Sequence, residues 1–262
     1  MKCILDAVIF SNCWISLGAV MCTLSTFLYY GQQIQYEYLL IIFLMTFFGY
    51  NIQMSSNPIS SNSRKNQTNW LSKYGQKMKY LSYILFIISI PLVIVTFSFE
   101  VLIFSLPAFI AVVVYKSKDY TSFGLRTIPS LKLILIALIW SWVCVVTPQL
   151  LFFSHVDFSF SIIVFTFILA ITIPFDIRDL NYDSENLRTL PQIVGSTVCV
   201  LIALSILLVL IFYSYFNLDK VGLCYLFTFT ALVILPSYKA RNEYYYLFLI
   251  DGFLVLFPIF VM

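Results

Sequence analysis

Three aspartates stand close together in the second half of the chain, at Asp176, Asp179 and Asp183. If the segment is helical, this spacing places all three carboxylates on one helix face. Carboxylates so arranged repel one another unless a positive group lies between them. Mg²⁺ is commonly held by one or two carboxylates together with substrate phosphate, and Arg178 and Arg188 could contact that phosphate directly. The pattern indicates a Mg²⁺–phosphate site; the alternative interpretation is a solvated helix end with Asp–Arg pairing.

The composition of the rest of the chain places these charges in a membrane protein. Hydrophobic residues make up 61% of the 262 residues, against 15 basic and 12 acidic ones, and the mean hydropathy is +0.95. A soluble domain of this length could not hide so much apolar surface. The six cysteines and the single histidine, His155, show no metal-binding spacing. We therefore expect one helical membrane domain over residues 1–262, with membrane lipid around it and no nucleic-acid partner.

Apolar runs near the ~20 residues that a helix needs to cross a bilayer recur along the chain. Nine segments are predicted, at residues 4–28, 36–54, 79–97, 100–116, 131–149, 158–178, 192–214, 221–238 and 243–261. The predicted fold class is an all-α integral membrane protein with nine transmembrane helices. The three aspartates then begin at the end of the sixth helix and run into the loop that follows it.

The basic residues predict the orientation of these helices. One side of the predicted bundle carries the N-terminus and the loops after the second, fourth, sixth and eighth helices. This side holds 14 of the 15 basic residues, and only Lys220 lies on the other. By the positive-inside rule, the N-terminus and the loops with the candidate site are cytoplasmic and the C-terminus is outside. The expected location is thus multi-pass in a membrane, which in a bacterium would be the plasma membrane.

The segment "DIRDLNYDSENLRTLPQIVG" resembles the second aspartate-rich motif of the UbiA superfamily of intramembrane prenyltransferases, an RDxxxD sequence after the sixth helix. Arg178, Asp179 and Asp183 match RDxxxD, and Asp176 matches the polar position before it. The tail of the motif is matched by Arg188, Thr189, Leu190 and Pro191. The glycine that the family has before the basic residue is missing, and the spacer is one residue short.

A second segment, "YKSKDYTSFGLRTIPSLKLILIALIWSW", resembles the family's passage from the fourth into the fifth helix. The resemblance implies a nine-helix UbiA-like bundle that binds an allylic prenyl diphosphate and a lipid-soluble acceptor. It implies that Asp179 and Asp183 act as catalytic ligands of a Mg²⁺–diphosphate complex, with Asp176 assisting as a metal ligand. It also implies diphosphate contacts from four basic residues, namely Arg126, Lys132, Arg178 and Arg188.

The family's first aspartate-rich motif, NDxxDxxxD after the second helix, is missing here. Asn51 takes the place of the asparagine, but the aspartate positions read Ile52, Ser55 and Ile59, and no acidic residue occurs between Glu37 and Glu100. Asn51 is interpreted as a remnant of a diphosphate site. Lys73 and Lys77 in the same connection could neutralise diphosphate in place of a metal. The alternative for these lysines is membrane topology and contact with anionic lipid.

Two functions are carried forward. The first is a UbiA-like prenyltransferase that transfers a polyprenyl group from its diphosphate to an aromatic or lipid-pathway acceptor. The second is a non-catalytic membrane protein of the same fold that binds an isoprenoid or quinone. A small transporter ranks below both, because no inverted halves with broken helices are evident. Asn12 and Asp251 are polar residues inside predicted helices, so they are either functional or joined by hydrogen bonds to neighbouring helices.

Overall fold

The computed structural model describes residues 2–54, 65–96, 103–107, 110, 131–180 and 189–262, and within these ranges every regular element is a helix. The first half of the chain forms α1 (Lys2–Phe10), α2 (Cys13–Tyr29), α3 (Tyr36–Met54) and α4 (Lys65–Thr96). A long broken helix follows, made of α6 (Leu131–Ser141), the π-helix η3 (Trp142–Val146) and α7 (Thr147–Phe152). The second half forms α8 (Ser159–Asp179), α9 (Leu190–Val194), α10 (Ser196–Phe216), α11 (Val221–Ile234), the 3₁₀-helix η5 (Leu235–Tyr238), the π-helix η6 (Tyr245–Ile250) and α12 (Asp251–Val261).

Several of these helices are long and apolar enough to cross a membrane. Among the described residues, five such spans lie at Asn66–Val95, Leu131–Phe152, Ser159–Asp179, Ser196–Phe216 and Val221–Tyr238. The pair α1 and α2 qualifies as a sixth if it is taken as one span bent by 61°. Two shorter apolar helices lie at Tyr36–Ile52 and Tyr245–Val261. The chain therefore has the helices of an all-α, multi-pass membrane protein, as its composition predicts.

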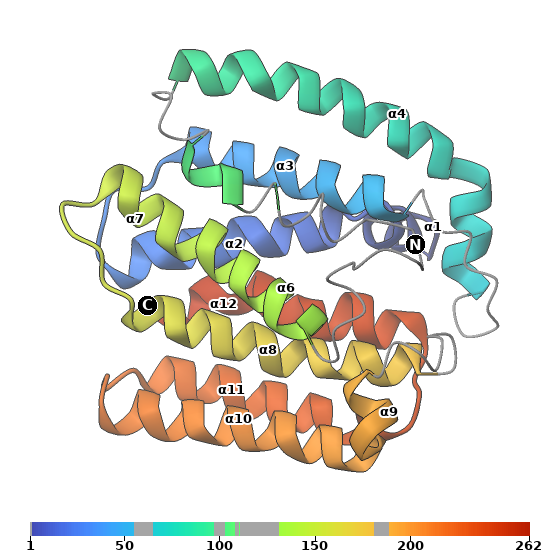
Figure 1. Ribbon diagram of the computed structural model, residues 1–262, viewed down its shortest axis with the longest axis vertical. Coiled ribbons are helices and arrows are strands. Elements are labelled where there is room, and N and C mark those ends of the chain that lie inside the picture. Colours follow the sequence, from blue (N-terminus) through green and yellow to red (C-terminus); the bar gives the residue numbers. More distant parts are fainter. Residues whose placement is uncertain (1, 55–64, 97–102, 108–109, 111–130, 181–188) are drawn as a thin grey trace.

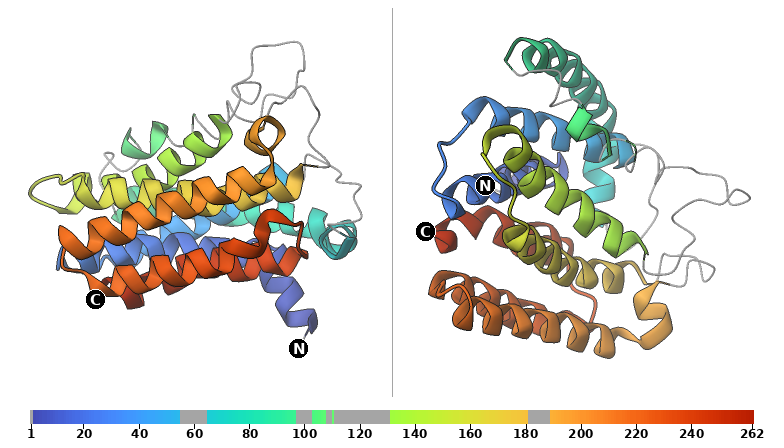
Figure 2. Two further views of the ribbon diagram at one scale, coloured as in Figure 1. Left: turned by 90° about the horizontal axis from the view of Figure 1, so that it is seen from below. Right: turned by 60° about the vertical axis from the view of Figure 1, so that its left-hand side comes forward.

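The helices lie side by side, and the two chain termini lie at opposite ends of the bundle (Figure 1). α10 and α11 form one outer side and α4 the other, as the right-hand view of Figure 2 also shows. Burial follows this arrangement, because 67% of the α8 span is buried inside the bundle against 17% of the α4 span. α8 is therefore the central helix. Within the core, its Phe167 packs against Phe227 of α11 and Phe257 of α12.

The first predicted helix, 4–28, is broken at Asn12, and the sequence prediction did not include this break. Asn12 has φ 69° and ψ 12°, a left-handed conformation that asparagine tolerates better than most residues. Asn51 of α3 supports the break: its amide nitrogen donates to the Ser11 carbonyl at 3.0 Å, and its side-chain oxygen accepts from the Asn12 amide at 3.3 Å. The interhelical hydrogen bond considered for Asn12 is thus confirmed.

Both π-helices have backbone carbonyls that accept hydrogen bonds from neighbouring helices. In η3, the carbonyl of Cys144 accepts from the Thr26 hydroxyl at 2.8 Å, and that of Val143 accepts from Tyr38 at 3.2 Å. In η6, the carbonyl of Phe248 accepts from the Trp14 indole at 3.1 Å. In an apolar bundle an unsatisfied carbonyl would be costly, so these side chains from α2 and α3 stabilise the irregular turns.

Two further predicted boundaries are wrong. The third predicted helix, 79–97, begins at Lys65 in the structure, because the preceding polar stretch is helical as well. The Glu243 carboxylate supports this start by accepting from the backbone N–H groups of Asn66 and Gln67 at 3.1 and 3.0 Å. The seventh, 192–214, is interrupted at Gly195, whose φ is 82°. Most of the fourth, 100–116, lies outside the described residues.

Candidate functional site

The candidate site lies at the end of the bundle where α8 finishes and α6 begins. The sequence prediction that the helix continues past Pro174 is confirmed, because α8 extends to Asp179. Asp176, Arg178 and Asp179 therefore stand in its last helical turn, and all three are buried. α8 is apolar along nearly its whole length and 67% of its span is buried, so its last turn carries these charges into the bundle.

Asp176 forms an ion pair with Lys132 in the first turn of α6. The Lys132 nitrogen lies 2.6 Å from the Asp176 carboxylate oxygen. The aspartate side chain is 2% exposed and the lysine side chain 28%, so the carboxylate lies inside the bundle and the ammonium at its edge. Charge-assisted hydrogen bonds of this length are among the stronger ones in proteins. The pair joins two residues 44 positions apart that the sequence analysis had placed in one site.

Arg178 and Asp179 form a second ion pair. The guanidinium donates from Nε to one carboxylate oxygen at 2.9 Å and from Nη2 to the other at 3.4 Å. The guanidinium carbon also lies 5.0 Å from the ring centroid of Phe175 and 5.4 Å from that of Tyr246. Aromatic faces attract cations at this range. The charge of Arg178 is therefore held by a carboxylate and by two rings from α8 and η6.

A third carboxylate, Asp251, stands at the first position of α12, directly after the π-helix η6. It is buried and lies within electrostatic range of Arg178 and of Tyr50 on α3. Within the described part of the chain, no hydrogen bond or ion pair joins the Asp251 carboxylate to another residue. Buried carboxylates inside membrane bundles are rare and usually functional. Asp251 therefore belongs to the candidate site, which the sequence analysis left open.

The five charged residues of the site do not balance. Lys132 and Arg178 face Asp176, Asp179 and Asp251, so the described cluster has two cations and three carboxylates. Two ion pairs neutralise four of these groups. A phosphate-bearing ligand would have to compete with the aspartates for the two cations.

Three other predicted residues lie elsewhere. Asn51 is 4% exposed, and its amide is engaged by backbone carbonyls of Ser11 and Phe47 and by Asn12. The structure therefore gives Asn51 a helix-packing contact in place of the predicted diphosphate contact. Lys73 and Lys77 stand one turn apart on the exposed face of α4, which faces away from the bundle. Asp183, Arg188 and Arg126 lie outside the described residues.

The described donor atoms do not amount to a magnesium site. No three His, Cys, Asp or Glu side chains among the described residues come together in a way that could hold a metal ion. Asp176 and Asp179 are each bound to a cation of the chain. The predicted metal site thus has two carboxylates in place, both of them already engaged, and its third predicted ligand, Asp183, in the part of the chain that is not described.

The aromatic side of the site was not predicted. Tyr246, Phe175 and Tyr50 come from three different elements, and a chain with 18 tyrosines and 26 phenylalanines offers no signal to single them out. Tyr246 is fully buried, and its hydroxyl accepts from the Arg241 backbone N–H at 3.1 Å. Only the contact with Arg178 shows its place in the site.

No family model matches this sequence, and no curated protein or solved structure is significantly similar to it.

Proposed function

We propose that this protein is a UbiA-like intramembrane prenyltransferase, which transfers a polyprenyl group from an allylic diphosphate to an aromatic or lipid-pathway acceptor. The observation that carries the proposal is the convergence of Lys132, Asp176, Arg178 and Asp179 at one end of an apolar helical bundle. A prenyl diphosphate has the same division, with a highly charged head and a long apolar chain.

The roles of the residues follow from their charge and position. Lys132 and Arg178 are proposed to donate hydrogen bonds to the diphosphate oxygens, as lysine and arginine commonly do for phosphates. Lys132 is the more accessible of the two, since 28% of its side chain is exposed against 10% for Arg178. The rings of Phe175 and Tyr246 hold the guanidinium while it changes partner. The prenyl chain would lie among the apolar helices.

The proposal extends to a nine-helix bundle with the charged end in the cytoplasm, to Asp183, Arg188 and Arg126 as further site residues, and to Mg²⁺. Two carboxylates and a diphosphate are a usual ligand set for this ion. Asp179 and Asp183 are the residues proposed to hold it, with Asp176 assisting. When bound, the ion would withdraw negative charge from the leaving diphosphate. Lys132 and Arg178 would also neutralise negative charge on the diphosphate.

A second candidate function is binding of an isoprenoid or quinone without catalysis. It is favoured by the ion pairs themselves, because Asp176 and Asp179 are both neutralised within the chain. It is also favoured by the absence of any acidic residue between Glu37 and Glu100, where the resemblance predicts the first metal-binding motif. A protein that only binds would need a neutral, preformed pocket and no second metal site.

The test is a turnover assay with the purified protein in lipid nanodiscs. Labelled farnesyl and geranylgeranyl diphosphate would be incubated with Mg²⁺ and a membrane lipid extract that supplies the acceptor. The proposal expects label in a new lipid product, and a loss of at least tenfold in Asp179→Asn and Lys132→Gln. Lys73→Gln on the outer face of α4 is the matched control, and melting temperatures would show that each variant is folded.

The outcomes separate the two candidates. Diphosphate binding that depends on Lys132 but gives no product would support the binding protein. Product formation that is unchanged in both site variants would contradict the assignment of the site. Absence of both binding and product would contradict the prenyltransferase.

A further inference from the structure

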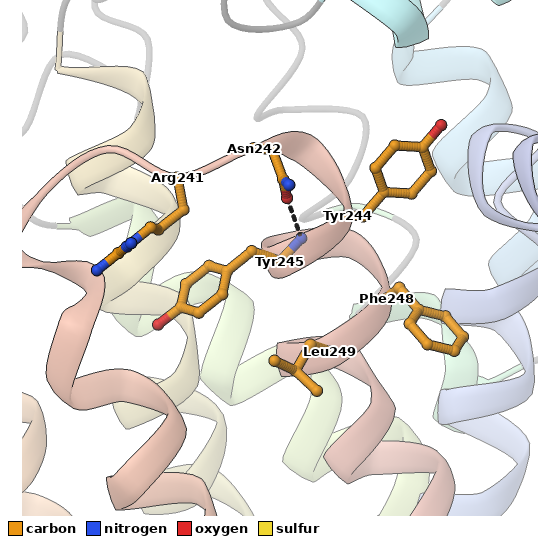
Figure 3. A pocket seen from close by; sticks show the side chains of 6 residues that line it. All are labelled: Arg241, Asn242, Tyr244, Tyr245, Phe248 and Leu249. Atoms are coloured by element: carbon orange, nitrogen blue, oxygen red, sulfur yellow. Dashed lines mark hydrogen bonds between the residues drawn. The ribbon is translucent and has the colours of Figure 1, made fainter.

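A shallow depression lies beside the connection between η5 and η6. This connection is at the end of the bundle that also holds the charged cluster of α8. Its volume is about 430 Å³. Six consecutive or nearly consecutive residues line it, namely Arg241, Asn242, Tyr244, Tyr245, Phe248 and Leu249 (Figure 3). Arg241 and Tyr245 lie on one side, Tyr244 and Phe248 lie on the other, and Leu249 lies below them (Figure 3). The lining is thus polar at one end and apolar at the other.

The polar end carries a fixed arginine with free donors. The Nε of Arg241 donates to the Pro236 carbonyl at 3.1 Å, which orients the side chain. Its terminal nitrogens make no hydrogen bond or ion pair with any described residue. The Asn242 side chain points away from the guanidinium, and its oxygen accepts from the Tyr245 backbone N–H at 3.0 Å (Figure 3). A planar guanidinium with free terminal donors fits a phosphate oxyanion.

The carboxylates nearest in sequence do not compete for Arg241. Glu243 is 3% exposed and faces the N–H groups of Asn66 and Gln67 at the start of α4. Asp6 accepts a hydrogen bond from the Tyr244 hydroxyl. Burial and this contact with Asp6 raise the pKa of Tyr244, so the phenol stays neutral. Arg241 is thus the one charged residue among the six that line the depression.

The other end is apolar and held in shape. The ring of Phe248 stacks on Trp14 with centroids 5.0 Å apart, and Trp14 donates to the Phe248 carbonyl. The Tyr245 hydroxyl is engaged by the Val233 carbonyl, so its ring lines the depression without an open polar group. Phe248 and Leu249 remain 38% and 44% exposed. These side chains offer a fixed apolar wall to a hydrocarbon chain.

The order of these groups matches the depth of a membrane. Arg241 and Asn242 lie in the connection between the span Val221–Tyr238 and the apolar helix Tyr245–Val261, and Phe248 and Leu249 lie inside that helix. We propose that the depression binds an anionic phospholipid, with the phosphate at Arg241 and an acyl chain along Phe248 and Leu249. The occupant is chosen by charge complementarity at one end and by apolar contact at the other. The inference does not depend on the prenyltransferase proposal.

Native mass spectrometry of the full chain, released from nanodiscs, tests this site by counting retained phosphatidylglycerol and phosphatidylcholine. The wild type is expected to retain phosphatidylglycerol in preference. Arg241→Gln is expected to weaken that retention about fivefold, which corresponds to ~1 kcal/mol for one basic residue near a membrane surface. Arg241→Lys should keep most of the preference, because it keeps the charge.

Two further variants separate the site from general surface charge. Lys239→Gln removes the same charge two residues away, outside the lining, and is expected to change the retention by less than twofold. Leu249→Ala should weaken both lipids equally, because it shortens the apolar wall. Equal effects of Arg241→Gln and Lys239→Gln would overturn the proposal. So would displacement of the lipid by inorganic phosphate alone, since that would show a site for the free anion.

Discussion

Replacing Lys132 by methionine would leave Asp176 as a buried, unpaired carboxylate. The methionine side chain fills much of the same volume, so the change removes the charge more than the packing. Breaking one partner of a buried ion pair costs about 3–5 kcal/mol. Because 28% of the Lys132 side chain is exposed while Asp176 is 2% exposed, solvent reaches the lysine side of the pair. We therefore expect the lower end, about 3 kcal/mol of lost stability.

Reversible unfolding in mixed micelles with increasing SDS, followed by circular dichroism, would measure this loss. The double variant Lys132→Met with Asp176→Asn removes both charges and is expected to recover at least about 2 kcal/mol of it. Lys73→Met, on the exposed face of α4, is the control and should change stability by less than about 0.5 kcal/mol. A Lys132→Met variant as stable as the wild type would refute the Lys132–Asp176 ion pair. A double variant no more stable than Lys132→Met would refute it as well.

Four further predictions follow from contacts elsewhere in the bundle. A Cβ at Gly222 would lie 2.2 Å from a backbone oxygen of α12, so Gly222→Ala should lower stability in the same SDS titration by about 1–3 kcal/mol. A Cβ at Gly49 would have no atom within 4 Å, so Gly49→Ala should stabilise α3 by about 0.5–1 kcal/mol. A loss of stability in this variant would contradict the open space beside Gly49. Glu243→Ala should speed hydrogen exchange at the first turn of α4, because its carboxylate caps those amides, whereas unchanged exchange would show that the cap is dispensable. Hydrogen bonds from Ser159 lower the pKa of Asp157, so the ionised Asp157 should make the wild type more stable than Asp157→Ala by about 1 kcal/mol at pH 7. This stability difference should shrink as the pH falls below the pKa of about 3.9 that the carboxyl has in the unfolded chain. A stability difference that stays constant down to pH 2 would show that the ionised form is not needed.

The helical membrane class could be predicted because the bilayer leaves few alternatives. A long uncharged run must satisfy its backbone internally, so apolar length alone predicts a helix. Each predicted segment apart from 100–116 lies mostly within helix in the structure, with breaks at Asn12 and Gly195 in two of them. The extension of α8 through Pro174 to Asp179 also followed from sequence, because the charged turn continues the same helical spacing.

The contacts within the site could not be predicted in the same way. Nothing in the sequence pairs Lys132 with Asp176, because that contact depends on how α6 crosses α8. The start of α4 at Lys65 was missed because its first turns are polar and resemble a loop, and the residue that caps them, Glu243, lies some 180 positions later. Asn51 matched a family motif by type, but hydrogen bonds at the Asn12 break explain its position better.

The most direct test of the central proposal is the affinity of the purified protein for geranylgeranyl thiolodiphosphate, a non-hydrolysable probe, measured by calorimetry with Mg²⁺ and with EDTA. The account predicts binding that Mg²⁺ strengthens and that falls at least tenfold in Lys132→Gln and in Asp179→Asn, while Lys73→Gln binds as the wild type does. Binding of equal strength in all four proteins, or no binding in any of them, would contradict the claim that the charged end of α8 is a diphosphate site.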